Sequence, residues 1–570
     1  MAIQENHHLH ALVDMGSNGI RFSISNLSPP TSRTLPTVFQ DRAAISLYDA
    51  QFRPGSSDRQ AIPSPVQEEV IRRLVRFKET CKDFGVPDGN ITALATEATR
   101  TAINSTEFLT AIKDNTGWDV NLLSKEEEGE LGALGIASSL ATVQGLVMDL
   151  GGGSTQISWM SAQDGEVRSS KMGSISFPYG AAAVTKRLEE AVGERLLVQQ
   201  KLGKEMVTKF QEAFRDLDIP KELLEHADQH GGFDLFLSGG GFRGWGYLLL
   251  SQSNVTPYPI PIINGFKVNR SEFGDIATVT DLALTKGSEV FGVSDRRASQ
   301  VPAVATLVNS LVEAIPTIKT IQFCQGGVRE GYLFKTLPQE MRAQNPLVVA
   351  TVPYQTPAFS ELSSLLSRAL PRGLSGHESR LVPESFTASL LSALANFMFA
   401  HSSVSKESRT AVALHSTTTG FLASVHGISH TDRALLALLL YDRWHGDLSP
   451  ADQSLLQRLR QTVSMEEVWW CQYLGRVAAF VGDIYPSGAI RNGSSRIEFS
   501  AEWARGKKDQ PRVFLNIKLL HRNTPWNDVD WLADAKGGIE KAGKKKNWVK
   551  AADRVDGKED WGLKVDVLLD

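Results

Sequence analysis

The stretch Val147–Ser158 reads VMDLGGGSTQIS, and the interpretation of the whole chain starts from it. An apolar run ends at Asp149, a glycine triplet and a Ser-Thr pair follow, and then a second run begins. Adjacent glycines let backbone N–H groups approach a phosphate, because no Cβ atom stands in the way. An acid at a strand end can hold Mg²⁺ directly or through water. The stretch indicates either a phosphate-binding hairpin or an ordinary glycine turn between strands.

A second copy of this pattern lies near the N-terminus, in Leu12–Ile24 (LVDMGSNGIRFSI). It contains an apolar run, Asp14, a turn of small residues and a run whose alternation is typical of a half-buried strand. Two hairpins of this kind, separated by the length of a lobe, predict two duplicated lobes that hold one phosphate chain. The second copy therefore favours the phosphate-binding interpretation of both.

Length and composition indicate a globular protein of several domains. The chain has 570 residues, of which 42% are hydrophobic and 22% charged. The net charge of -4 argues against a nucleic-acid binder, so DNA is not an expected partner. Three distant cysteines predict a reducing compartment, and the sequence has neither an apolar leader core nor an apolar run long enough for a bilayer. We expect a cytoplasmic protein without membrane contact.

Together the two hairpins resemble the phosphate motifs of the actin-like ATPase superfamily. GSNGIR (16–21) and GGGSTQ (151–156) are more narrowly similar to the Ppx/GppA family of exopolyphosphatases and guanosine pentaphosphate phosphohydrolases, above all to its fungal branch, the retrograde regulation protein 2 type. The resemblance implies an α/β fold with two actin-like (ribonuclease H-like) lobes around a cleft. The expected boundaries are 1–140 for lobe I, 141–345 for lobe II, 346–480 for a helical domain and 481–570 for a small α+β C-terminal region.

The resemblance also assigns roles to single residues. It implies that Asp14 and Asp149 hold Mg²⁺ and that Arg21 contacts phosphate, although an arginine on a strand can also be merely solvated. The element ATEATRTAIN (95–104) matches a family motif at a helix start, where Arg100 either binds phosphate or pairs with Glu97 on its own helix. The expected phosphate-binding residues are Ser17, Asn18, Arg21, Arg100, Gly151, Gly152, Gly153, Ser154 and Thr155.

The segment SKEEEGELGALGIAS (124–138) is expected to open a helix. Ser124 followed by Glu127 predicts a capping box at its start. The family resemblance implies that the neighbouring Glu128 is the catalytic residue, which orients or deprotonates the attacking water. A base near the terminal phosphoryl group, Mg²⁺ and backbone N–H donors form a minimal set for phosphoanhydride hydrolysis.

A third glycine-rich turn follows an expected strand in FDLFLSGGGFRGW (233–245). It stands where the actin-like superfamily has a glycine motif on the adenosine side, and a plain strand-to-helix turn is the alternative. The residues that the resemblance implies for nucleotide binding are Gly239, Gly240, Gly241 and Arg243.

Three positions depart from the bacterial pattern of the family. Gly19 replaces a serine, Glu97 a small residue, and Gln156 a glutamate that helps to hold metal. One hypothesis is an enzyme with Mg²⁺-dependent hydrolysis of polyphosphate, a guanosine penta- or tetraphosphate, or ATP. The other is a nucleotide-sensing regulator of mitochondria-to-nucleus retrograde signalling that acts through protein partners. The departures favour the regulator, whereas the intact Glu128 favours the enzyme.

The last third of the chain carries weaker chemical signals. Residues 345–385 suggest a domain junction, and 386–480 are expected to be helical. Strands are expected in SRIEFSAEW (495–503) and PRVFLNIKLL (511–520). The basic run KAGKKKNWVK (541–550) is either a solvated loop or a patch for a polyanion or nuclear import. Four scattered histidines lack a metal-site spacing and are expected to be structural: His415, His426, His430 and His445.

Overall fold

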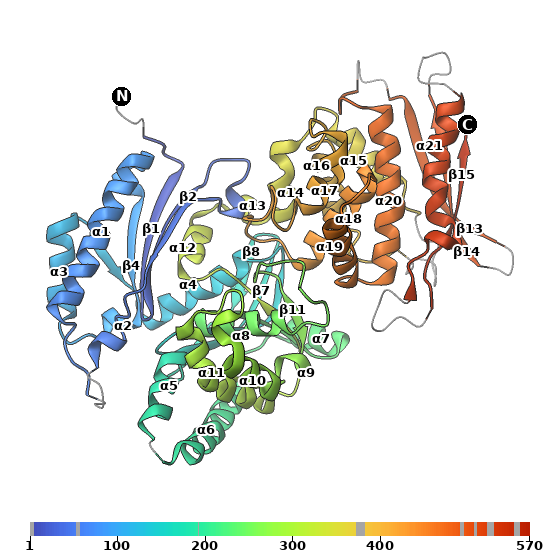
Figure 1. Cartoon of the computed structure of the whole chain (residues 1–570). Helices are drawn as coiled ribbons and strands as arrows, with labels where there is room; N and C mark the ends of the chain where they lie inside the picture. Colours follow the sequence, from blue (N-terminus) through green and yellow to red (C-terminus); the bar gives the residue numbers. More distant parts are fainter. Residues whose placement is uncertain are drawn as a thin grey trace. The chain divides into compact units, whose positions relative to one another are not determined.

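The computed structural model describes residues 5–52, 58–191, 193–371, 382–490, 495–506, 510–520, 529–551 and 559–570. The chain folds into two compact units, and Figure 1 shows their helices and strands. Unit 1 comprises Met1–Gln252, Ile263–Pro346 and Val425–Ile428, and unit 2 comprises Ser253–Ile262, Leu347–Ser424 and Ser429–Asp570. No helix among the described residues is long and apolar enough to cross a membrane.

The first sheet of unit 1 has five strands in the order β3-β2-β1-β4-β5. β1 and β2 form an antiparallel hairpin, and β4 and β5 continue the sheet as parallel strands. The helix α1 (Ser64–Phe84) covers this sheet with buried residues that recur every three or four positions, and it ends at the left-handed Gly85. The strands are β1 (Leu9–Gly16), β2 (Gly19–Asn26), β3 (Thr37–Ala43), β4 (Ile91–Ala95) and β5 (Val120–Leu122).

The second sheet of unit 1 runs β11-β12-β10-β6-β7-β8, with β9 beside β7. β6 and β7 form its antiparallel hairpin, and β10 and β12 follow β6 as parallel strands. Its strands are β6 (Val143–Leu150), β7 (Thr155–Gln163), β8 (Glu166–Ser169), β9 (Ile175–Phe177), β10 (Phe233–Ser238), β11 (Lys267–Asn269) and β12 (Ile318–Phe323).

The two sheets repeat one plan. In each, a hairpin has an antiparallel neighbour on one side and two parallel strands on the other, so that β3-β2-β1-β4-β5 corresponds to β8-β7-β6-β10-β12. The prediction of two actin-like α/β lobes is therefore confirmed. The repeat also aligns two cross-strand pairs, because Asp14 lies opposite Arg21 in the first hairpin and Asp149 lies opposite Gln156 in the second.

The helices α4 (Lys125–Ser138) and α12 (Val328–Thr336) touch through glycines. A Cβ atom on Gly331 would lie 1.8 Å from the carbonyl oxygen of Leu131, and one on Gly135 would lie 2.3 Å from that of Gly327. No side chain fits between the two backbones at these points. The other helices of unit 1 are α2 (Glu97–Arg100), α3 (Ser105–Thr116), α5 (Ala181–Glu190), α6 (Arg195–Asp216), α7 (Lys221–His230), α8 (Gly240–Ser251), α9 (Arg270–Phe273), α10 (Ile276–Lys286), α11 (Asp295–Ala314) and α13 (Gln339–Arg342).

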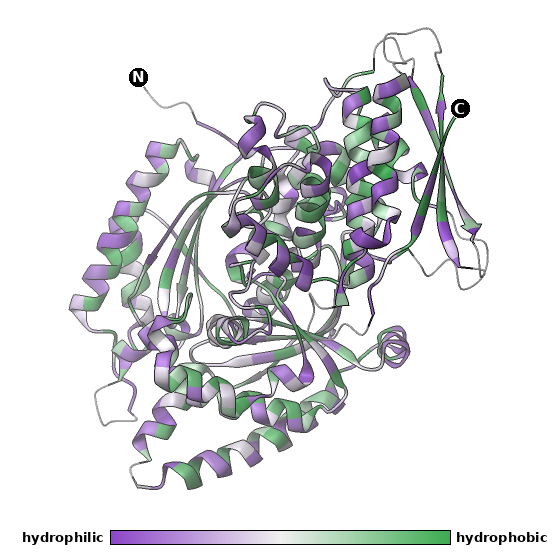
Figure 2. Cartoon of the chain, turned by 45° about the vertical axis from the view of Figure 1, so that its right-hand side comes forward, coloured by the Kyte–Doolittle hydropathy of each residue, from purple (hydrophilic) through white to green (hydrophobic). Residues whose placement is uncertain are grey.

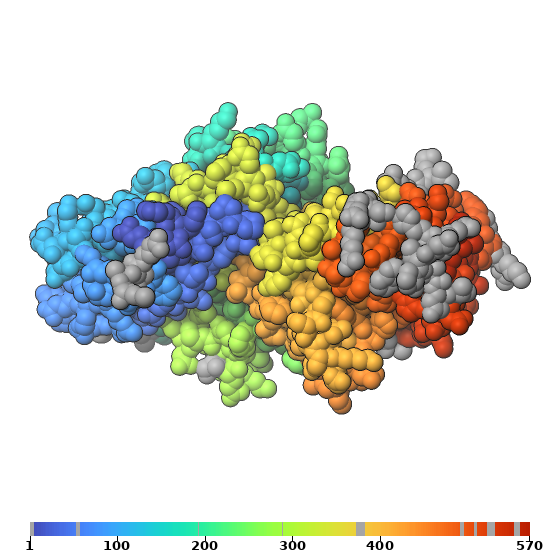
Figure 3. Space-filling model, turned by 90° about the horizontal axis from the view of Figure 1, so that it is seen from above, coloured from blue at the N-terminus to red at the C-terminus, as the bar shows by residue number. Residues whose placement is uncertain are grey.

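The C-terminal end of α4 is held by distant segments of unit 1. The buried Arg33 donates hydrogen bonds to the carbonyl oxygens of Ser138 (3.1 Å) and Arg342 (3.0 Å). Arg342 belongs to α13, and Figure 3 shows α12 and α13 (yellow) beside the first lobe (blue). The hydroxyl of Ser138 also lies 2.8 Å from the ring Nε2 of His426, which belongs to the late segment Val425–Ile428. The end of α4 is thus held by residues from segments that lie far apart in the sequence.

Unit 2 is helical up to residue 484 and then α+β, as predicted. The strands expected in 495–503 and 511–520 form an antiparallel pair. Figure 2 shows that the helices have hydrophobic and hydrophilic faces. The segment 345–385, where a domain junction is suggested, contains the change from unit 1 to unit 2 at Pro346. It also contains two helices, since Leu362, Leu365 and Leu366 give α15 a buried face. The elements are α14 (Pro346–Thr351), α15 (Phe359–Arg368), α16 (Ala388–Phe397), α17 (Lys406–His415), α18 (His430–Trp444), α19 (Pro450–Gln461), α20 (Met465–Ile484), β13 (Ile497–Arg505), β14 (Pro511–Leu519), α21 (Val529–Glu540) and β15 (Lys564–Leu569).

Candidate functional site

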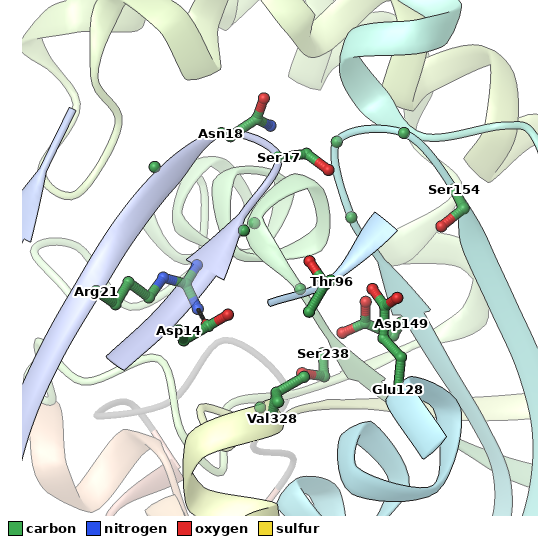
Figure 4. A pocket seen from close by; sticks show the side chains of 18 of the residues that line it. Asp14, Ser17, Asn18, Arg21, Thr96, Glu128, Asp149, Ser154, Ser238 and Val328 are labelled. Atoms are coloured by element: carbon green, nitrogen blue, oxygen red, sulfur yellow. Dashed lines mark ion pairs between the residues drawn. The ribbon is translucent and has the colours of Figure 1, made fainter. Parts of the chain in front are cut away.

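A cavity of about 130 Å³ lies in unit 1 between the two lobes, where the turns of both hairpins meet (Figure 4). Its walls come from β1, β2, β3, β6, β7, β10 and the starts of α4, α8 and α12. The predicted site residues that line it are Asp14, Ser17, Asn18, Arg21, Glu128, Asp149, Gly151, Gly152, Gly153, Ser154, Gly239, Gly240 and Arg243.

The glycine loop after β6 presents backbone N–H groups. Its carbonyl oxygens accept hydrogen bonds from the start of α5, with Ala181 donating to Gly151 and Ala182 to Gly152, both at 2.9 Å. Among the described residues, no acceptor lies on the N–H groups of Gly152, Gly153 and Ser154. A loop whose carbonyls are paired and whose N–H groups are open is suited to an anion.

The two hairpin turns approach each other closely. A Cβ atom on Gly152 would lie 2.7 Å from the amide nitrogen of Asn18, and one on Gly153 would lie 2.3 Å from a carboxylate oxygen of Glu97. Arg296 of α11 connects the lobes at the same place, because it donates to Asn18 at 2.7 Å and to Asp49 at 2.8 Å. Gly152 and Gly153 of the second turn therefore leave no room for a side chain at this approach.

Three carboxylates enter the cavity from different elements. Burial raises the pKa of Asp14 against the opposing charge of Arg21, whose guanidinium lies 3.9 Å away. Burial also raises the pKa of Asp149, which the Ser238 hydroxyl and Arg21 partly offset. The pKa of Glu128 rises to about 7, mainly through burial, and Asp149 and Asp14 raise it further. The charge of Asp14 thus raises the pKa of the other two carboxyl groups, so the three groups lie close enough to interact electrostatically.

Arg100 pairs with Glu128 and not with Glu97. Its guanidinium Nη1 lies 3.2 Å from Glu128 Oε2, while Glu97 lies 3.6 Å from Arg59. The alternative of a local Arg100–Glu97 pair is therefore wrong, because Arg100 faces α4. Arg100 does not line the cavity but contacts the residue predicted to be catalytic. The predicted capping box is confirmed, since the Ser124 hydroxyl accepts from the N–H of Glu127 at 3.1 Å.

The donors around the cavity suit Mg²⁺ that is shared with a ligand. Among the described residues, no three His, Cys, Asp or Glu side chains form a ready metal-binding group. Mg²⁺ is, however, commonly held by one or two carboxylates together with phosphate oxygens and water. Asp14 and Asp149, whose buried charges repel each other, fit this role. Gln156 also lines the cavity, and its amide donates to the Ser154 hydroxyl at 2.9 Å.

Several arginines of the site were missed by the sequence interpretation. Arg42 of β3 lines the cavity together with the predicted Arg21 and Arg243. Burial and the neighbouring arginines lower the pKa of Arg243 to about 10 and also lower those of Arg42 and Arg297. The cationic groups thus lie near enough to repel one another, and an anionic ligand would relieve that repulsion. Arg42 and Arg297 stand in no glycine motif, so no pattern pointed to them.

Two predicted site residues point elsewhere. The Thr155 hydroxyl donates to the carbonyl oxygen of Asp149 at 2.6 Å, which closes the hairpin turn. A Cβ atom on Gly241 would lie 2.5 Å from the side chain of Leu150, so the glycine allows α8 to pack on β6. Neither residue lines the cavity. Two of the histidines expected to be structural make contacts within the protein: His415 Nε2 lies 2.8 Å from Asp452 Oδ1, and His430 Nε2 lies 2.7 Å from the carbonyl oxygen of Ile262.

Asn104, which completes the ATEATRTAIN motif, is tied to the backbone of Ile62. It accepts from the Ile62 N–H at 2.8 Å and donates to the Ile62 carbonyl at 3.1 Å. We expect Asn104→Ala to lower the free energy of unfolding by about 1–2 kcal/mol, because two backbone groups lose their partners. Urea denaturation measures the loss, and Asn115→Ala on the exposed face of α3 is the control. Weaker phosphate binding at unchanged stability would contradict this structural role.

Two sheets of one plan, each with a strand–acid–glycine hairpin at the same cavity, define a two-lobe protein of the actin-like class. The model of the Ppx/GppA phosphatase family matches residues 28–340, more than half of the chain, and that of the RTG2 C-terminal domain matches residues 345–570. The chain therefore belongs to the Ppx/GppA phosphatase family.

The chain is also similar to individual known proteins. The chain is 39% identical over 498 residues to Retrograde regulation protein 2 of Saccharomyces cerevisiae. The aligned region covers 85% of this chain and 82% of the yeast protein. A solved Ppx/GppA family member of Aquifex aeolicus is 23% identical and covers 57% of this chain and 96% of its own, with a TM-score of 0.42. MreB5 of Spiroplasma citri bound to ADP is 13% identical and covers 41% of this chain and 85% of its own, with a TM-score of 0.24.

Proposed function

We propose that the cavity between the lobes binds a phosphoanhydride ligand: polyphosphate, a guanosine penta- or tetraphosphate, or ATP. One observation carries the proposal. The N–H groups of Gly152, Gly153 and Ser154, which have no acceptor among the described residues, line the same cavity as Arg21, Arg42 and Arg243. Backbone N–H groups and guanidinium groups are both strong donors to phosphate oxygens. Several cationic groups around one cavity favour a ligand with more than one phosphate.

The carboxylates extend the proposal to hydrolysis of the terminal phosphate. Asp14 and Asp149 would hold Mg²⁺, which when bound neutralises charge on the phosphate oxygens. Glu128, with a pKa of about 7, is suited to take a proton from an attacking water near neutral pH. Arg100, which pairs with Glu128, would keep that carboxylate oriented.

A regulatory function is the second candidate, and specific observations favour it. The amide of Gln156 stands at the cavity wall where the family resemblance implies a metal-binding carboxylate. The Glu97 carboxylate lies against Gly153 and would repel a phosphate there. With the name of the yeast relative, these features support a nucleotide-sensing regulator of retrograde signalling that acts in the cytoplasm through protein partners.

Calorimetry and phosphate release distinguish the two candidates. The full chain is titrated with polyphosphate, guanosine pentaphosphate and ATP, with and without Mg²⁺, and released phosphate is measured in parallel. Release that Mg²⁺ supports indicates a hydrolase, and binding without release indicates a sensor. Arg243→Gln should weaken binding in either case, and the matched control is Arg187→Gln on α5. Absence of both binding and release would refute the proposal.

Gln156→Glu tests whether one amide limits metal binding. We expect the variant to need about tenfold less Mg²⁺ for ligand binding or phosphate release, because a carboxylate is the better ligand. A magnesium titration measures the shift. Gly19→Ser would be a poor companion, since Gly19 has φ +155° and a Cβ atom would lie 3.1 Å from the Ala43 carbonyl oxygen. An unchanged magnesium dependence in Gln156→Glu would show that Asp14 and Asp149 alone set it.

A further inference from the structure

A second cavity, of about 650 Å³, lies within unit 2. The helices α18, α19 and α20 form one wall, and the segment 546–550 forms another. This segment is the end of the basic run for which the sequence left two alternatives open, a solvated loop or an anion patch. The structure places it against the helices, so its lysines face a concave surface that contains other cationic side chains.

Four cationic residues line this cavity: Arg460, Arg476, Lys546 and Lys550. Among the described lining residues the acid is Asp442, which is buried and lies 3.9 Å from Arg476 Nε. Outside the lining, Asp560 pairs with Lys550 at 2.7 Å. Within the described part of the chain, cationic side chains thus outnumber acidic ones at this cavity, and such a lining is suited to an anion.

The cavity also offers aromatic and amide groups. Trp548 and Tyr441 add aromatic surface, and Gln457 and Gln472 add amides that both donate and accept.

We propose that this cavity binds a small phosphorylated organic anion. Its phosphate would contact Arg460, Arg476 and Lys546, since guanidinium and ammonium groups bind phosphate through charge-assisted hydrogen bonds. Its organic part would lie against the apolar ring of Trp548. The proposal concerns unit 2 alone and does not depend on the function of the cavity in unit 1.

The test separates this cavity from the one between the lobes. AMP and pyrophosphate are titrated by calorimetry into the full chain carrying Arg243→Gln, which weakens the first site. Into this background we introduce Arg460→Gln together with Lys546→Gln. The matched control is Arg458→Gln with Lys544→Gln, since these residues lie on the same segments but do not line the cavity.

We expect binding in the Arg243→Gln background, unchanged by the control pair and weakened at least about tenfold by Arg460→Gln with Lys546→Gln. Tighter binding of AMP than of pyrophosphate would assign the organic part to the aromatic wall, and equal binding would assign recognition to the phosphate. No binding in this background, or binding that the cavity substitutions leave unchanged, would overturn the proposal. Lys546→Gln alone, at an exposed position, covers the case in which Arg460→Gln fails to fold.

Discussion

Glu128→Gln is expected to lower phosphate release by about 10²- to 10⁴-fold while ligand binding persists, if the protein is a hydrolase. The glutamine keeps the size of the side chain and a hydrogen-bonding oxygen for Arg100, which lies 3.2 Å from the carboxylate. It cannot take a proton from water. Single-turnover release and calorimetry on the same preparation separate the loss of chemistry from a loss of affinity.

The pH dependence of Glu128→Gln provides a second readout. Burial raises the pKa of Glu128 from 4.5 to about 7, so the folded protein binds a proton that the unfolded chain has already released between these values. Stability is therefore present at low pH and is lost as the pH rises through this window. Between pH 5 and pH 8 and in the absence of metal, the free energy of unfolding of Glu128→Gln should therefore rise by about 2 kcal/mol relative to that of the wild type.

Glu127→Gln is the matched control for both readouts. Glu127 is the neighbour of Glu128 but accepts from the N–H of Ser124 at 2.8 Å in the capping box and does not line the cavity. We expect it to lower helix stability slightly and to leave the rate and its pH profile unchanged. Equal losses of rate in the two variants would contradict the role assigned to Glu128.

Gly331→Ala is expected to destabilise unit 1 by about 2–4 kcal/mol, although alanine favours helices by about 1 kcal/mol over glycine. The added Cβ atom would lie 1.8 Å from the carbonyl oxygen of Leu131. The overlapping atom belongs to the backbone, so no rotamer change relieves it and α4 must separate from α12. Because α4 carries Glu128, activity should fall together with stability.

Gly132→Ala on α4 is the control for this substitution. A Cβ atom at Gly132 would have no neighbour within 4 Å, so the same chemical change meets open space. We expect its stability to equal or exceed that of the wild type, as urea denaturation would measure. A similar loss in both variants would show that the effect does not come from the contact between α4 and α12.

Much of the fold of unit 1 could be predicted because its motifs are local. The hairpins around Asp14 and Asp149 require an acid, a turn of small residues and a second strand within a short stretch, and each leaves a pattern in the sequence. The capping box at Ser124 is local in the same way. The structure brings these segments to one cavity because the sheets repeat one topology.

The remaining parts of the site depend on tertiary packing and leave no local pattern. Arg42 comes from a third strand, and the partner of Arg100 lies 28 residues away along the chain. Both relations arise from the register of β3 with β2 and from the docking of α4, which spacing does not reveal. A helical domain is expected from residue 346, but the bounds of the single helices within 345–385 could not be predicted, because proline and serine interrupt the pattern, whereas three leucines give α15 a buried face.

Because unit 1 includes the late segment Val425–Ile428, the two units cannot be separated by one cut in the chain. A fragment that stops at Pro346 would lack His426, whose ring nitrogen lies 2.8 Å from the Ser138 hydroxyl at the end of α4. The same helix carries Glu128 at its other end. Dissection of the protein by truncation would therefore disturb the first cavity even though no cavity residue is removed, and point variants of the full chain are the sounder way to assign each function.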